Sequence, residues 1–316
     1  MSAGRHTELP FTGPATFFKA PYVPVGALAP AGYDAALLGV PFDFAVGFRP
    51  GARFAPAAVR AASGRYALPA EGFYDQETDT FRLAGARLVD AGDVDPAQLE
   101  TAVSHDRITA AARALRAAAR LPVFVGGDHS VSYPLLRAFD DVSELHVVQL
   151  DAHLDYSEAR NATRFANSSP FRRAVEALPG LQHITVLGLR GVRADAEAFR
   201  AARARGHELV SARAVRAGLA EAIEKLPRGA TVYLSVDVDA LDAAELPGTG
   251  SPEPEGLGYG ELRDLVAATF ARNRVVGMDL MELAPELDPT GRSALLAARL
   301  LAEALAAWWE ARGRAG

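Results

Sequence analysis

The residues that follow one β-like segment carry side chains that bind metal ions. The segment 145–150 reads LHVVQL, and Asp151, His153 and Asp155 come after it at every second position. In an extended backbone alternate side chains point to the same side, so these three are expected to converge. Carboxylate and imidazole groups are ligands of divalent cations. The alternative is a polar strand end whose side chains make caps and salt bridges.

Two other β-like segments end in the same chemistry. PVFVGG is followed by Asp128 and His129, and its glycine pair permits a tight turn that could swing a side chain inward. TVYLSVDVD carries Asp237 and Asp239 at alternate positions. Taken alone, such a histidine is more often a core or capping residue, and a single D-x-D motif is ambiguous. Three such endings on near-consecutive strands favour one shared metal site.

The candidate ligands are too numerous for one small cation and suit two cations that share carboxylates. They are His129, Asp151, His153, Asp155, Asp237 and Asp239. Four carboxylates match the charge of two divalent ions, and an added hydroxide makes the site anionic, which suits a cationic substrate. Two metals about 3.5–4 Å apart can activate one water as a nucleophile. Carboxylate-rich ligation without thiolate favours Mn²⁺, with Zn²⁺, Ni²⁺ or Co²⁺ as alternatives, and the imidazoles disfavour Ca²⁺.

Short β-rich runs alternate with helix-like stretches over most of the chain, which predicts an α/β fold with a mainly parallel sheet and helices on both faces. The expected strands lie at 35–40, 86–92, 122–127, 145–150, 183–189, 207–212, 231–238 and 274–280. The expected helices lie at 101–119, 194–205, 213–225, 259–271 and 292–312. Ligands of such sheets bind beyond the carboxyl ends of the strands, where the three candidate motifs fall. We expect an N-terminal arm, residues 1–33, and a single catalytic domain, residues 34–316.

Composition narrows the class of protein. The chain has 316 residues, of which 49% are hydrophobic and 23% charged, close to a soluble globular average. Its net charge is −6 and it has no basic stripe, so we expect no nucleic-acid partner. It has no cysteine, which excludes disulfides, thiolate zinc sites and a cysteine nucleophile. The N-terminal segment lacks an apolar core of signal-peptide length, and the apolar C-terminal helix carries Arg299 and Glu303, so we expect a cytoplasmic protein without a membrane partner.

The three motifs together resemble a known family. GGDHS, DAHLD and SVDVDALD, in this order and at these separations, resemble the metal motifs of the ureohydrolases, which include arginases and agmatinases. GVPFD, GFRPGARFAP and MELAP also resemble agmatinase segments, so the likeness covers most of the chain. The resemblance implies a three-layer α/β/α sandwich around a mainly parallel sheet of about eight strands. It also implies two Mn²⁺ ions per subunit and a homo-oligomer, often a trimer or hexamer.

The resemblance assigns a role to each candidate ligand. One metal would be held by His129, Asp151, Asp155 and Asp237. The other would be held by Asp151, His153, Asp237 and Asp239. Asp151 and Asp237 would therefore bridge the two ions. Water activated between the ions would attack the guanidinium carbon of the substrate, and Asp155 would carry a proton to the leaving nitrogen, which yields urea and a free amine.

Three further residues are candidates for contact with the substrate. Glu282, in MELAP, matches the family carboxylate that accepts hydrogen bonds from the guanidinium, although it could instead be a surface or capping residue. Thr249, in the Pro/Gly-rich loop 247–257, is a weaker candidate. Many agmatinases have S-H-G-T-P-F where this chain has ANSSPF, so Asn167 stands in the position of the histidine. An amide does not titrate near neutral pH, so Asn167 can orient a substrate or water but cannot shuttle a proton.

The leading functional prediction is hydrolysis of a small cationic guanidino compound, agmatine, to putrescine and urea. The same chemistry on guanidinobutyrate or formiminoglutamate is the main alternative. Arg49 and Arg53 could face a substrate carboxylate, although a structural role in their loop is favoured. A catalytically silent assembly or binding homologue is a further alternative, and the presence of every ligand together with Glu282 argues against it. A related deacetylase fold is disfavoured because its tandem histidines are missing.

Overall fold

The computed structural model describes residues 9–97 and 99–314, and an eight-stranded sheet lies at its centre. The strands are β1 (Tyr33–Gly39), β4 (Leu88–Asp93), β5 (Ala119–Val125), β6 (Leu145–Leu150), β7 (Leu181–Leu189), β8 (Glu208–Ser211), β9 (Thr231–Asp237) and β10 (Arg274–Met281). Their order in the sheet is β4-β1-β5-β10-β9-β6-β7-β8, and each neighbouring pair is parallel. All eight predicted strands are confirmed.

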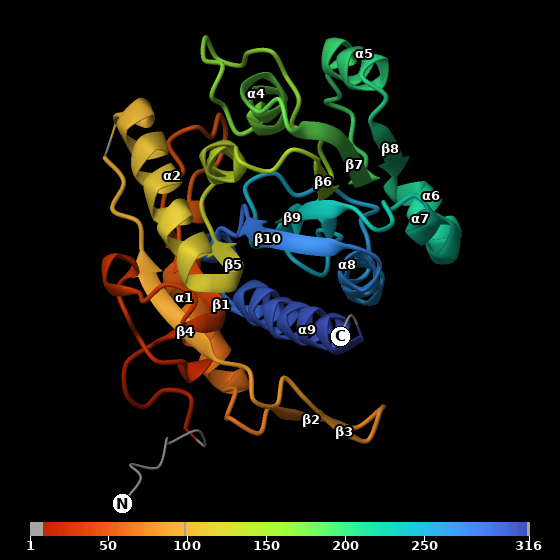
Figure 1. Cartoon of the computed structure of the whole chain (residues 1–316). Helices are drawn as coiled ribbons and strands as arrows, with labels where there is room; N and C mark the ends of the chain where they lie inside the picture. Colours follow the sequence, from red (N-terminus) through yellow and green to blue (C-terminus); the bar gives the residue numbers. More distant parts are fainter. Residues whose placement is uncertain (1–8, 98, 315–316) are drawn as a thin grey trace, which may run out of the picture.

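Helices cover both faces of this sheet (Figure 1). One face carries α1 (Ala55–Ser63), α6 (Ala212–Ala217), α7 (Leu219–Glu224), α8 (Tyr259–Arg272) and α9 (Arg292–Arg314). The other face carries α2 (Thr101–Ala118), α3 (Ser132–Leu136), α4 (Pro170–Ala177) and α5 (Ala196–Ala204). Each set of helices packs on the sheet through its own cluster of buried apolar residues. The predicted three-layer α/β/α sandwich is therefore confirmed.

The central strands are apolar on both sides because both sides are covered. In β5, Val123 and Val125 belong to one apolar cluster, and Phe124 between them belongs to the other. All three side chains are fully buried. A strand buried on both faces reads as a continuous apolar run, which is why PVFV and its counterparts could be recognised in the sequence.

Three local features differ from the prediction. The helix expected over 213–225 is two helices, α6 and α7, because Gly218 between them has an extended backbone. Helices α1, α3 and α4 were not predicted, since all three are short and carry a proline in their first turn, in stretches rich in turn residues. A two-stranded antiparallel hairpin, β2 (Phe73–Asp75) and β3 (Thr80–Arg82), was also missed.

The predicted N-terminal arm is attached to the domain over its described part, and residues 1–8 lie outside the described residues. Phe17 and Phe18 are buried. The backbone N–H of Phe17 donates to Asp90 at 2.9 Å, and the guanidinium of Arg60 lies 4.3 Å from the centre of the Phe17 ring. Asp90 belongs to β4, so the segment packs at that edge of the sheet.

The long helix α9 is amphipathic, as predicted. Its charged residues Arg299 and Glu303 form an ion pair of 3.1 Å one turn apart. Across the part of the chain that the structure describes, α9 included, no helix combines the length and the apolarity that crossing a membrane requires.

Candidate metal centre

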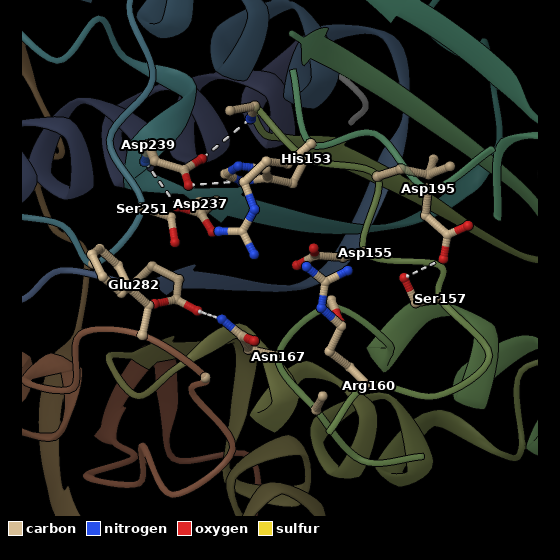
Figure 2. A pocket seen from close by; sticks show the side chains of 18 of the residues that line it. His153, Asp155, Ser157, Arg160, Asn167, Asp195, Asp237, Asp239, Ser251 and Glu282 are labelled. Atoms are coloured by element: carbon tan, nitrogen blue, oxygen red, sulfur yellow. Dashed lines mark hydrogen bonds and ion pairs between the residues drawn. The ribbon is translucent and has the colours of Figure 1, made fainter. Parts of the chain in front are cut away.

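Four adjacent strands at the middle of the sheet bring the predicted site residues to one edge. In the order β5-β10-β9-β6, these strands are followed at their carboxyl ends by the candidate ligands and by Glu282. Figure 2 shows the side chains of this edge converging on one cavity from several loops. The prediction that the three motifs meet at the carboxyl ends of parallel strands is confirmed, and β10 adds a fourth ending between two of them.

The alternate spacing suggested that these side chains converge from an extended backbone, and this prediction is wrong. Strand β6 ends at Leu150, and the chain bends before Asp155, which adopts a left-handed backbone with φ of 50°. Strand β9 ends at Asp237, and a 3₁₀ turn, Val238–Ala240, carries Asp239. These bends separate the candidate ligands within one motif. As a result, the ligands of one motif can face two different clusters rather than one.

The first group of ligands surrounds one nitrogen of His129. Its Nδ1 lies 3.1 Å from Asp151 Oδ2, 3.1 Å from Asp155 Oδ2 and 3.2 Å from Asp237 Oδ2. This nitrogen is buried and has no hydrogen-bond partner of acceptable geometry among the described residues. One N–H could serve only one of three convergent carboxylate oxygens, whereas a cation can bind all of them and the nitrogen. The donor set therefore fits a divalent metal ion.

The second group shares Asp151 with the first. His153 Nδ1 lies 3.0 Å from Asp239 Oδ2 and 3.6 Å from Asp151 Oδ1, and these three residues form a second candidate cluster. Asp237 belongs to the first cluster only, and its Oδ1 accepts a hydrogen bond of 2.8 Å from the backbone of Asp239. The structure thus shows Asp151 between the two clusters, and bridging by Asp237 stays a prediction.

The pKa values of these residues show how strongly the buried charges act on each other. Burial, followed by the charge of Asp151, raises the pKa of Asp155 to about 6. Burial and the charges of Asp239 and Asp151 raise the pKa of Asp237 well above its usual value. Burial lowers the pKa of His129, but the carboxylates close to its ring outweigh burial and raise the pKa overall. Two divalent cations would compensate the charge of all four carboxylates.

Unusual backbone conformations help to aim these side chains. Asp155 and Glu282 have φ of 50° and 64°, a region that residues other than glycine adopt uncommonly. Gly127, ahead of His129, has φ of 94°, and a Cβ there would lie 2.6 Å from the carbonyl oxygen of Val40. The predicted glycine turn is therefore required by the fold, since a side chain at Gly127 would collide with the neighbouring loop.

A buried hydrogen-bond chain orients the His129 ring. Its Nε2 lies 2.9 Å from Ser235 Oγ, and Ser235 Oγ donates to Asp279 Oδ1 at 2.6 Å. Because the serine proton goes to the carboxylate, the serine oxygen is free to accept the proton on Nε2. This arrangement favours the tautomer with a lone pair on Nδ1, which is the form that binds metal. Ser132 and Tyr233 hold Asp279 Oδ2, each at 2.8 Å.

We expect Ser235→Ala to weaken binding of the metal at His129 by about 10- to 100-fold, because the imidazole loses the partner that fixes its tautomer. Isothermal titration with Mn²⁺ measures this affinity. Ser104→Ala is a matched control, since Ser104, in α2 and away from the site, is equally buried and donates to the Ala97 carbonyl. Metal affinity equal to that of the unaltered protein in Ser235→Ala would show that this chain does not orient the ligand.

Glu282 and Asn167 are in direct contact. The Asn167 Nδ2 donates to Glu282 Oε1 at 3.0 Å, and the backbone N–H of His129 donates to the same oxygen at 3.0 Å (Figure 2). Among the described residues Glu282 Oε2 has no hydrogen-bond partner, although the side chain faces the cavity. Burial and the nearby charge of Asp128 raise the pKa of Glu282 to about 8. A bound cation would stabilise the charged carboxylate.

The other predicted contacts are placed differently. Thr249 is buried, its Oγ1 has no partner among the described residues, and it is not on the cavity wall. Its neighbours Gly250 and Ser251 line the wall instead. Arg53 pairs with the buried Asp43, as the structural interpretation predicted.

The cavity has a volume of about 450 Å³, a size typical of small-molecule sites. Four candidate metal ligands, His153, Asp155, Asp237 and Asp239, form its floor, and Asn167 and Glu282 stand on one wall. The outer wall includes four arginines that sequence reasoning did not connect with the site, apart from the open question over Arg49. They are Arg49, Arg160, Arg190 and Arg193.

Sequence reasoning also missed the residues whose hydrogen bonds orient the candidate ligand His129. Ser235 and Asp279 are fully buried polar residues within the strands β9 and β10. Their signal was visible, because a polar side chain inside an otherwise apolar central strand needs a buried partner. The arginines gave no comparable signal, since charged residues in loops are usually solvated.

Comparisons with known proteins agree with this geometry. Residues 33–307 match the sequence model of the arginase family. The chain is 34% identical over 310 residues to proclavaminate amidinohydrolase of Streptomyces clavuligerus, covering 95% of this chain and 93% of that one. The solved structure of that enzyme has a TM-score of 0.84 and 32% identity, covering 96% of this chain and 99% of that one. The chain is also 34% identical to guanidinobutyrase of Pseudomonas aeruginosa (94% and 93% covered) and to mitochondrial agmatinase of Gallus gallus (87% and 81% covered).

Proposed function

Given that this chain belongs to the arginase family as an agmatinase-like ureohydrolase, we propose that it hydrolyses a small guanidino compound to urea and an amine at two divalent metal ions. One observation carries the proposal. The orphaned Nδ1 of His129 has three carboxylate oxygens 3.1–3.2 Å from it, and two of these carboxylates, Asp155 and Asp237, line the same cavity as Glu282. A cation-binding floor beside a buried carboxylate is what hydrolysis of a guanidinium requires.

The residues of the two clusters would hold the metals. One ion would bind His129, Asp151, Asp155 and Asp237. The other would bind Asp151, His153, Asp237 and Asp239, with Asp151 and Asp237 shared. Two bound cations supply Lewis acidity that lowers the pKa of water and so provides a nucleophile near neutral pH. Carboxylate-rich ligation leads us to propose Mn²⁺ as the metal. We also propose that the protein is a cytoplasmic homo-oligomer.

Glu282 and Asp155 would act on the substrate. The free oxygen of Glu282 would accept hydrogen bonds from the planar guanidinium and hold its carbon over the metal site. Hydrolysis forms a bond from the water oxygen to that carbon and breaks the bond from the carbon to the substituted nitrogen. Asp155 would take a proton from the water and pass it to the leaving nitrogen. The products are urea and the amine.

We expect Asn167→Ala to lower kcat/KM by roughly 5- to 150-fold, or about 1–3 kcal/mol, with unchanged metal content. The structure supplies the reason, since the amide donates to Glu282 Oε1 and its loss lets the carboxylate shift. Steady-state urea release and metal analysis measure both quantities. Asn167→His asks whether proton transfer limits the rate, in which case kcat should rise and gain a pH dependence near the imidazole pKa. Full activity of Asn167→Ala on every guanidino compound would show that this residue has no role in substrate binding or turnover.

The proposed function is tested by urea release from metal-loaded and chelator-treated protein. The panel is agmatine, 4-guanidinobutyrate and butylguanidine, whose far end carries no charge. We expect urea and amine in equal amounts from at least one compound, loss of activity with chelator and recovery with Mn²⁺. Absence of urea from a wide panel of guanidino compounds, with two metals bound, would contradict the proposal. The panel includes both charged compounds because the chain is 34% identical to a guanidinobutyrase and 34% identical to an agmatinase.

A further inference from the structure

The outer wall of the cavity carries arginines that lack acidic partners. Arg160 and Arg193 both line it, and neither pairs with a carboxylate of residues 9–97 or 99–314. Arg190 differs, because its guanidinium donates to backbone carbonyls, including those of Asp239 at 2.6 Å and Leu241 at 3.0 Å. Two cations on this wall are therefore available to a ligand.

The backbone at Arg160 is fixed by a tight turn. In this turn Arg160 and Thr163 exchange backbone hydrogen bonds of 2.8 and 2.9 Å. The two residues between them, Asn161 and Ala162, have φ of 49° and 62°. The turn is packed against the opposite loop, since a Cβ at Gly47 would lie 2.6 Å from Asn161 Nδ2. Figure 2 shows the Arg160 side chain pointing from this turn into the cavity.

Arg49 adds a third cation from the opposite loop. Its Nη2 donates to the Thr249 carbonyl at 3.4 Å, and its Nε is buried without a hydrogen-bond partner among the described residues. A buried, unpartnered guanidinium nitrogen on a cavity wall is costly unless a ligand or water accepts its proton.

The acidic groups of the outer cavity do not cancel this charge. Asp195 caps helix α5 through the backbone of Glu197 at 3.0 Å and accepts from Ser157 at 3.1 Å. Glu253 Oε1 faces His153 Nε2 at 3.9 Å. The ligand carboxylates are matched by two divalent cations, and Glu282 is matched by the guanidinium. The outer wall then has four arginines against two carboxylates.

Resting on the proposed function, we propose that the preferred substrates are guanidino acids, whose far end is a carboxylate bound by Arg160. With the guanidinium at Glu282, the far end of the substrate extends toward the arginine wall. A carboxylate there gains charge-assisted hydrogen bonds, whereas the ammonium of agmatine meets like charge. The structure thus favours guanidinobutyrate, the alternative from the sequence, over agmatine.

The test uses three compounds that differ in the charge of the far end: 4-guanidinobutyrate (negative), butylguanidine (neutral) and agmatine (positive). We expect kcat/KM from urea release by the Mn²⁺-loaded protein to fall in that order, by at least about tenfold from the first to the last. Arg160→Gln should lower kcat/KM for guanidinobutyrate by roughly 10- to 100-fold and leave butylguanidine within about twofold. Arg160→Glu should also raise kcat/KM for agmatine.

Arg164→Gln is the matched control, because Arg164 lies in the same loop but pairs with Glu158 and Glu176 and is not on the cavity wall. It should leave all three values unchanged. Metal content and melting temperature confirm that each variant is folded, and Arg193→Gln provides a second variant on the same wall. Urea released fastest from agmatine would overturn this inference and leave the proposed function standing. An equal loss on all three compounds in Arg160→Gln would also overturn it, whereas urea from none of a wide panel would overturn the proposed function itself.

Discussion

Asp237→Asn is expected to lose one or both metals and to lower kcat/KM by more than about 100-fold. In the structure, this substitution changes the role of only one of the two carboxylate oxygens. Asp237 Oδ1 accepts the backbone N–H of Asp239 at 2.8 Å, and an asparagine oxygen can keep that bond. The change falls on Oδ2, which lies 3.2 Å from His129 Nδ1 and becomes an amide NH₂ that cannot bind a cation. Loss of a group that only supports a metal ligand lowers metal affinity or activity by about 10- to 100-fold, so loss of a ligand should lower them by at least that factor.

Metal content by elemental analysis and urea release measure the two effects. Asp140→Asn is a suitable control for the lost charge, because Asp140 is half-exposed and pairs with Arg113 on the surface. It should retain both metals and full turnover. Two bound metals with near-normal urea production in Asp237→Asn would show that Asp237 is not a ligand, and the assignment of a shared carboxylate would then fail.

Glu282→Gln is expected to retain both metals and to lower kcat/KM by roughly 10- to 150-fold, or about 1.5–3 kcal/mol. The amide oxygen can keep the bonds that Oε1 accepts from Asn167 and from the His129 backbone, each 3.0 Å. The amide NH₂ would then replace the free Oε2 and present donors to the donors of the guanidinium. We therefore expect KM to rise and kcat to fall while the fold is unchanged.

Kinetics and metal analysis of the same sample separate the two roles of Glu282. Glu286→Gln is a control of the same chemistry in the following 3₁₀ turn, Pro285–Leu287, outside the cavity wall. Loss of metal in Glu282→Gln would identify Glu282 as a ligand or structural residue. Unchanged kinetics would place the guanidinium elsewhere.

The sheet and the candidate metal ligands could be predicted because their signals are local. Strands buried on both faces read as apolar runs, and parallel strands end at one edge, so the chemistry that follows them must meet. The bends after Leu150 and Asp237 carried no such signal, because they depend on contacts with other loops. The alternate spacing of Asp151, His153 and Asp155 therefore indicated correctly where candidate ligands gather, but the strand geometry inferred from it was wrong.

The walls of the cavity could not be predicted, because they come from loops far apart in the sequence. Arg49, Arg160 and Arg193 follow different strands, and only the fold brings them to one side of the cavity. The role of Asn167 was partly visible, since its amide chemistry excluded proton transfer. Its bond to Glu282 depends on the distance between β10 and the loop after β6, which the sequence does not encode locally.

The most direct test of the metal centre is anomalous diffraction from crystals grown with Mn²⁺, measured at the manganese absorption edge. We predict two anomalous peaks per chain, about 3.5–4 Å apart, both contacted by Asp151 and Asp237. One peak should lie at bonding distance from His129 Nδ1 and the other from His153 Nδ1. A single peak, or two peaks that share no carboxylate, would contradict the two-metal site on which the proposed hydrolysis depends.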